Sequence, residues 1–160
     1  MIRALVISAV LATPAAAGTV AEQAIATFNA VCFKAGQTAD QARSRMEARD
    51  GTPLPYTLTF WDRSLAPAPQ APTRIERRCE VSFAGDHTEA AIAALRTQMA
   101  RPPVFGFRID LPETHAPQTG TALIEGRELL RGRIAVVHVG LREGETFIGV
   151  DRLPDGWEDS

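Results

Sequence analysis

The chain has few of the residues and none of the short motifs from which enzyme sites are usually recognised. Among its 160 residues are two cysteines, three histidines and one lysine. It has no nucleophile elbow, no H-E-x-x-H helix, no P-loop, no G-x-G-x-x-G turn and no C-x-x-C pair. The hydrolases, zinc peptidases, nucleotide-binding proteins and thiol oxidoreductases that carry such signatures are therefore disfavoured. Enzymes without short signatures stay open.

The chain also lacks a block of basic residues. Its formal net charge is -2, and Lys34 is the only lysine, so the other 16 of its 17 lysine and arginine residues are arginines. A mildly acidic chain without a basic patch is a poor candidate for binding nucleic acid or an anionic membrane surface. Arginine in place of lysine, together with abundant alanine, is typical of GC-rich bacterial genomes. A single arginine is therefore a weak functional signal.

No apolar run is long enough to span a bilayer, but the N-terminus resembles a secretory signal peptide. Arg3 provides a short positive region, residues 4–12 are apolar, and Ala15 and Ala17 fit the small-x-small cleavage rule. We expect residues 1–17 to be removed on export, so that the mature protein is periplasmic or secreted. The alternative is a short buried N-terminal helix.

The remaining chain is long enough for one domain with its own hydrophobic core. We expect a single α+β domain over residues 18–153, followed by an acidic C-terminal tail over residues 154–160. The tail contains Trp157, which we expect to pack back on the domain.

The clearest strand pattern in the chain surrounds the second cysteine. Residues 74–83 alternate between apolar and polar side chains, with Arg77 as the exception. This pattern directs Cys79 toward a core, on the same side as Ile75, Val81 and Phe83.

The first cysteine, Cys32, falls on the apolar stripe of a helix that follows Thr19. Both thiols thus face the same core. In an exported protein we expect them to form a disulfide that joins this helix to the cysteine strand. The loop-entropy model gives such a bridge roughly 4 kcal/mol of stabilisation. The alternative is two buried free thiols.

Periodicity and capping residues predict the other elements. Capping boxes begin helices at Thr19 and Thr38. Asp86 and Thr88 compete to cap a third helix, which prolines stop, and Glu89 completes a box for Asp86. Proline-rich residues 64–73 form a loop. Strands are expected at residues 56–61, 74–83, 104–111, 122–130, 134–141 and 146–150, the last three as a meander. The fold class is therefore α+β, with helices packed on one face of a curved antiparallel sheet.

This order of helices and strands resembles the nuclear transport factor 2 superfamily. That resemblance implies a curved sheet wrapped around a pocket closed by helices. A plain curved sheet with a filled core is equally compatible with the pattern. A helix cysteine paired with a strand cysteine also resembles small exported proteobacterial proteins of uncharacterised function, which implies a location but no chemistry.

His138 is the candidate catalytic base because it lies in the most apolar strand, where burial favours neutral imidazole. Glu125, Glu128 and Asp151 lie on neighbouring predicted strands and are its candidate partners. The alternative is a core or edge histidine bonded to the backbone.

The other histidines carry weaker signals. His87 lies between Asp86 and Glu89, a set that could touch a metal, although both acidic residues are explained as helix caps. His115 lies in a proline-bounded loop and is expected to be solvated. We predict no metal and no cofactor.

Arginines alternate with glutamates along the predicted strands. They could bind a carboxylate or phosphate, or simply form a solvated sheet face with cross-strand pairs. The residues concerned are Arg74, Arg78, Arg127, Arg131, Arg133, Glu76, Glu80 and Glu128.

We therefore expect an exported, non-catalytic module that binds a small ligand or another envelope protein. The alternative is a pocket enzyme of the isomerase or dehydratase type that uses His138 as its base.

Overall fold

The computed structural model describes residues 19–101 and 106–157, so the expected leader (1–17) and the end of the expected tail lie outside the described residues. Within this part of the chain the elements are α1 (Val20–Val31), α2 (Ala39–Asp50), β1 (Thr57–Asp62), β2 (Arg77–Ala84), α3 (Thr88–Met99), β3 (Arg108–Ile109), β4 (Thr121–Glu128), a 3₁₀ turn (Leu130–Gly132), β5 (Ile134–Arg142) and β6 (Glu145–Arg152).

The strands form one antiparallel sheet in the order β1-β2-β6-β5-β4-β3. Strands β4, β5 and β6 form the expected meander, and β1 and β2 are joined by the proline-rich loop. The last strand of the meander, β6, pairs with both β5 and β2. It is therefore a central strand, and the side chains of β2 and β5 flank it.

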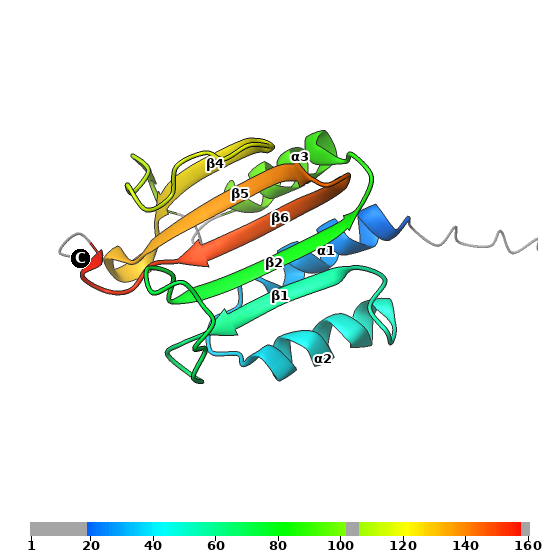
Figure 1. Cartoon of the computed structure of the whole chain (residues 1–160), viewed down its shortest axis with the longest axis horizontal. Helices are drawn as coiled ribbons and strands as arrows, with labels where there is room; N and C mark the ends of the chain where they lie inside the picture. The colour runs from blue at the N-terminus through cyan, green and yellow to red at the C-terminus, as the bar shows by residue number, and fades with distance from the viewer. Residues whose placement is uncertain (1–18, 102–105, 158–160) are drawn as a thin grey trace, which may run out of the picture.

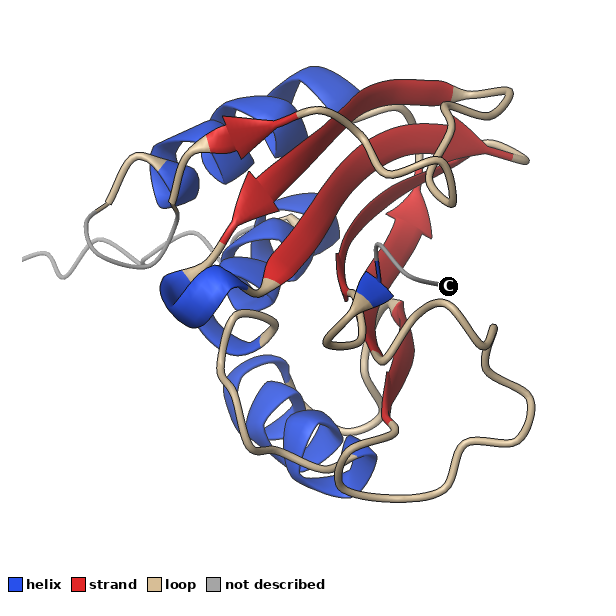
Figure 2. Cartoon of the chain, turned by 90° about the vertical axis from the view of Figure 1, so that its left-hand side faces the viewer, coloured by secondary structure: helices blue, strands red, loops and turns tan. Residues whose placement is uncertain are grey.

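Helices α1 and α3 lie behind the sheet in the view of Figure 1, and Figure 2 shows that the sheet is curved. Helix α2 packs against α1 and β1. The expected fold class is thus confirmed as α+β, with helices on one face of an antiparallel sheet. No helix in residues 19–101 and 106–157 is long and apolar enough to cross a membrane.

The capping boxes expected at the first two helices are both formed. In α1 the Thr19 hydroxyl accepts from the Glu22 N–H while the Glu22 carboxylate accepts from the Thr19 N–H, and Thr38 with Gln41 does the same in α2. These exchanges satisfy backbone donors that the first turn leaves unpaired.

The start of α3 differs from the expected capping box of Asp86 and Glu89. The N-cap is His87, with no side-chain cap bond, and Asp86 instead accepts from both the N–H and the hydroxyl of Thr88. This local turn competes with the cap for the same carboxylate. The strand expected over residues 104–111 is also shorter: β3 covers only Arg108–Ile109, and residues 104 and 105 lie outside the described residues.

The hydrophobic core fills the space between the helices and the sheet. Side chains alternate between the two faces of each strand, so Cys79, Val81 and Phe83 of β2 lie in the core, where β2 packs against α1, while Arg78 and Glu80 lie on the opposite face. The same alternation in β5 places Val137 and Val139 in the core and His138 on the opposite face.

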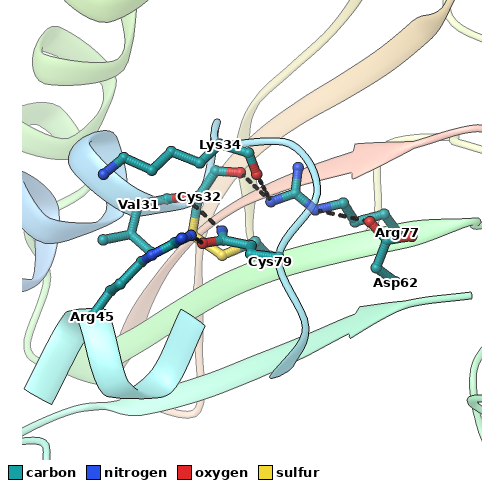
Figure 3. The surroundings of a disulfide bond; sticks show 8 residues. Val31, Cys32, Lys34, Arg45, Asp62, Arg77 and Cys79 are labelled. Carbon is teal, nitrogen blue, oxygen red and sulfur yellow. Dashed lines mark hydrogen bonds and ion pairs between the residues drawn. A yellow bond between two sulfur atoms is a disulfide. The ribbon is translucent and has the colours of Figure 1, made fainter. Parts of the chain in front are cut away.

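Cys32, the C-cap of α1, and Cys79 of β2 form the expected disulfide, with their Cα atoms 5.4 Å apart. Beside it, Arg77 donates from Nη2 to the carbonyl oxygens of Cys32 (2.9 Å) and Lys34 (2.7 Å), as Figure 3 shows. Arg77 is the residue that broke the strand alternation. It is buried on the core face because its guanidinium satisfies carbonyls at the end of α1.

Candidate functional site

A cavity of about 330 Å³ opens on the sheet face that the helices do not cover. We call it the sheet-face cavity. Strands β2, β6 and β5 form its floor, and the loop before β4 forms one wall. It is lined by Pro72, Ile75, Arg78, Glu80, Thr114, His115, Ala116, Gln118, Thr119, Thr121, Ile124, His138, Arg142, Phe147 and Asp151.

A glycine in the central strand lets two chemical groups meet in this cavity. Gly149 of β6 is opposite His138 of β5 on one side and Glu80 of β2 on the other. A Cβ atom on Gly149 would lie 2.2 Å from His138 Nε2, so only glycine leaves room for the ring. The imidazole therefore crosses β6, and its Nε2 lies 3.1 Å from Glu80 Oε2.

A second histidine and carboxylate lie beside this pair. Asp151 of β6 is completely buried, and it accepts two hydrogen bonds from Arg78, at 2.7 Å from Nε and 2.5 Å from Nη2. His115 Nε2 is 3.2 Å from Asp151, and its Nδ1 is 2.7 Å from the Thr114 hydroxyl. Both ring nitrogens of His115 are thus bonded, which fixes the loop onto the sheet.

The electrostatics keep both carboxylates ionised. Burial alone would raise the pKa of Glu80, but the hydrogen bond to His138 and the charges of His138, Arg142 and Arg78 outweigh it and lower the pKa. The pKa of Asp151 is lowered in the same way, because the hydrogen bonds of Arg78 and His115 outweigh its burial. Burial alone would lower the pKa of the Arg78 guanidinium, but its hydrogen bonds to Asp151 and the negative charge of that carboxylate outweigh burial and raise the pKa.

An ionised carboxylate can only accept hydrogen bonds, so Nε2 of His138 carries the proton that Glu80 receives. In a neutral ring Nδ1 is then an unprotonated acceptor. Among the described residues none is hydrogen-bonded to Nδ1 of His138, and His138 lines the cavity. It is therefore the open nitrogen of the cavity, whereas His115 has none.

The rim of the cavity combines charge with apolar surface. Arg142 donates from Nη2 to Glu80 at 2.9 Å, and its guanidinium lies 4.6 Å from the centre of the Phe147 ring. The Arg142 side chain is 59% exposed, so it lies where the cavity opens to solvent. Phe147 and Ile124 provide apolar surface beside His138, whose ring centre is 5.9 Å from that of Phe147.

The structure brings one of the three sequence-predicted partners into the cavity with His138. Asp151 lines the same cavity but bonds to Arg78 and His115. Glu125 is opposite Val137, so it lies on the helix-covered face, where Arg127 donates to it at 2.8 Å. Glu128 is opposite Ile134, four residues along β5, or about 13 Å from the level of His138.

Two residues of the site were not recognised in the sequence. His115, expected to be solvated, is only 8% exposed because its loop folds over the sheet. Glu80, read as part of a solvated charged face, is only 9% exposed and is the carboxylate that contacts His138. The sequence signal that could have found Glu80 is Gly149, a glycine in the middle of an apolar strand, which marks a close approach from another group.

Among the described residues no three His, Cys, Asp or Glu side chains are grouped so that they could hold a metal ion. Comparison of the chain with protein-family models, curated proteins and solved structures finds no match. The resemblance to the nuclear transport factor 2 superfamily therefore remains one of element order. The sheet-face cavity also lies away from the helices, not between helices and sheet as that resemblance implied.

Proposed function

We propose that the protein is an exported module that binds a small polar ligand in the sheet-face cavity. The observation that carries this proposal is the contrast between the two buried histidines. His115 uses both ring nitrogens within the protein, whereas His138 is held by Glu80 on one side and presents Nδ1 to the cavity. In the neutral ring Nδ1 is an acceptor, and a ligand that donates a hydrogen bond satisfies it.

The cavity has the size and lining of a small-molecule site. Its volume of about 330 Å³ is at the lower end of the roughly 300–1,000 Å³ that such pockets occupy. Apolar surface from Phe147 and Ile124 lies next to the polar groups that orient a ligand. The ligand class is therefore a compact molecule with one hydrogen-bond donor and one apolar side.

Export is part of the same proposal. The chain begins with an apolar segment that fits a signal peptide, and the disulfide between Cys32 and Cys79 is the type of bond that persists in oxidising compartments. We place the protein in the periplasm or the medium of a bacterium. Fractionation of cells that express the tagged chain tests this. Recovery from the cytoplasm with residues 1–17 intact would exclude it.

Binding is tested by blocking the cavity without disturbing the core. Ala116 is exposed and lines the cavity, so Ala116→Trp fills its mouth. Ala66, exposed in another loop, gives Ala66→Trp as the matched control. A library of small polar metabolites is screened by thermal shift on the oxidised protein. Compounds that stabilise the protein and Ala66→Trp but not Ala116→Trp support the proposal. A library without such compounds, or equal stabilisation of both variants, contradicts it.

The open Nδ1 also favours a second candidate, an enzyme of the isomerase or dehydratase type. In that chemistry Nδ1 accepts a proton from a substrate carbon next to a carbonyl, and Glu80 stabilises the imidazolium through Nε2. The proton then returns to a neighbouring carbon, or to a departing hydroxyl that leaves as water. Turnover of a bound compound that is lost in His138→Gln supports catalysis. Unchanged turnover in that variant, or none in the wild type, excludes it.

A further inference from the structure

A second pocket, of about 200 Å³, lies on the other side of the sheet, at the end of α1 next to the disulfide. We call it the helix-end pocket. Most of its lining is apolar, and two of its exposed residues, Ala35 and Leu130, lie where it meets solvent. It is lined by Cys32, Phe33, Ala35, Arg77, Leu129, Leu130, Arg133, Ala135, Val150 and Arg152.

The charged residues that line the helix-end pocket are all cationic. They are Arg77, Arg133 and Arg152, and no carboxylate is among the lining residues. Two carboxylates that do not line the pocket contact these arginines. Asp62 is 3.7 Å from Arg77 and 3.1 Å from Arg152, and Glu76 accepts a hydrogen bond from Arg152 at 2.8 Å. Burial, which outweighs the attraction of Asp62, lowers the pKa of Arg77 to about 10, so it still carries its charge at neutral pH.

Arg133 differs from the other two arginines. Arg77 donates to the carbonyls at the end of α1, and Arg152 donates to Glu76, Asp62 and Ser64. The side chain of Arg133 makes no hydrogen bond or ion pair with any described residue, and its Nε is sealed from solvent without an acceptor. The terminal Nη groups are not among the sealed donors, so they are the part of this guanidinium that a bound anion can reach and pair with.

The residue is nevertheless held in place. The N–H of Leu129 donates to the Arg133 carbonyl at 2.6 Å, which closes the turn between β4 and β5 at the edge of the pocket. The guanidinium therefore starts from a fixed backbone position, although no residue in the described ranges accepts a hydrogen bond from it.

From these contacts we infer that the helix-end pocket binds a small amphipathic carboxylate, with its anionic end on Arg133 and its short apolar part against Phe33, Leu129 and Ala135. Arginine forms charge-assisted, often paired, hydrogen bonds with carboxylates. The volume is below the roughly 300 Å³ at which pockets for drug-sized ligands begin, so the apolar part is a short chain or a single ring. This site is separate from the sheet-face cavity.

The test uses octanoate and phenylacetate as probes, with octanol as the uncharged counterpart. Their binding to the purified, oxidised protein is measured by isothermal titration. Arg133→Gln removes the unpaired guanidinium, and Arg131→Gln removes the same charge from an exposed neighbour in the same turn. Ala35→Phe narrows the mouth from an exposed position.

We expect at least one carboxylate to bind, with octanol at least about tenfold weaker because it lacks the charge that the guanidinium binds. Arg133→Gln weakens carboxylate binding by about tenfold or more, and Ala35→Phe abolishes it, whereas Arg131→Gln leaves it within about twofold. Failure of both carboxylates to bind, equal binding of octanol, or equal effects of the two arginine variants would overturn the inference.

Backbone amide spectra separate this site from the proposed ligand site. Binding of the carboxylate is expected to shift the amide signals of Phe33, Leu129 and Ala135 and to leave those of Glu80 and His138 in place. Shifts confined to Glu80 and His138 would overturn the inference while supporting binding in the sheet-face cavity.

Discussion

His138 Nε2 lies 3.1 Å from Glu80 Oε2 although β6 separates the strands that carry the two residues. The contact exists because Gly149 of β6 has no side chain beneath the imidazole. One ring nitrogen is thereby fixed by a carboxylate and the other faces the sheet-face cavity. This relationship is the basis of the predictions about the site.

Gly149→Ala is expected to displace the His138 ring from Glu80. The new methyl group overlaps Nε2, and overpacking of this kind costs about 1–3 kcal/mol. The free energy of unfolding is measured by urea denaturation. In the His138→Ala background the same glycine substitution meets no ring, so its cost is expected to fall below about 1 kcal/mol. Equal costs in the two backgrounds would show that the ring does not require this glycine.

The helices, the cysteine strand and the burial of both thiols were predictable from short-range patterns, whereas the pairing of the thiols was predicted from the expected export as well. The alternation around Cys79 and the helical stripe through Cys32 each extend over a few residues, and both place the thiol toward the core. The capping boxes at Thr19 and Thr38 are likewise local. Each pattern is complete within one element, so it does not depend on the order of strands in the sheet.

The pairing of His138 with Glu80 was not predictable in this way. The two residues are 58 positions apart, and they meet only because β6 returns between β2 and β5. Without that strand order, the residues on adjacent predicted strands, Glu125 and Glu128, were the natural candidates. His115 was missed for a related reason: a loop has no periodicity that shows which of its residues are buried.

Removal of the disulfide is expected to lower the free energy of unfolding. The bridge closes a loop with a sequence separation of 47, and the loop-entropy model gives roughly 4 kcal/mol for that length. Urea denaturation of the variant with both cysteines changed to serine measures the loss. In wild-type protein an alkylating agent under denaturing, non-reducing conditions should leave both thiols unlabelled. Labelling of Cys32 and Cys79 would contradict the bridge.

Arg77→Gln is expected to destabilise the protein by about 3 kcal/mol. The substitution removes the hydrogen bonds that Arg77 donates to the carbonyls at the end of α1. It also removes one of the arginine partners of the buried Asp62, and breaking a buried ion pair costs about 3–5 kcal/mol. Arg63→Gln is the control, because the Arg63 side chain is exposed and donates to the carbonyl of Thr73 in the loop, with no buried carboxylate involved. Similar losses in the two variants, measured by urea denaturation, would contradict the role of Arg77.

Stability is expected to fall as the pH drops below about 4. The folded-state pKa values of Glu80 and Asp151 are lowered below the ordinary values of about 4.3 and 3.9. Between the folded and unfolded pKa values the unfolded chain binds more protons, so the free energy of unfolding rises with pH there and is lost on acidification. Urea midpoints from pH 7 downward measure this. Glu80→Gln should flatten the acid slope, and an unchanged slope would exclude Glu80 as a contributor.

The proposed ligand site is tested most directly by the ring signals of the histidines. The chain has three, and only His115 and His138 lie in the sheet-face cavity, whereas His87 is exposed at the start of α3 and serves as an internal control. Protein labelled only at histidine is titrated with the polar compounds that stabilise it. We predict that the ring nitrogen signals of His138 shift most, those of His115 less, and those of His87 not at all. Compounds that bind without moving the His138 signals, or that move His87 equally, would contradict a ligand site in this cavity.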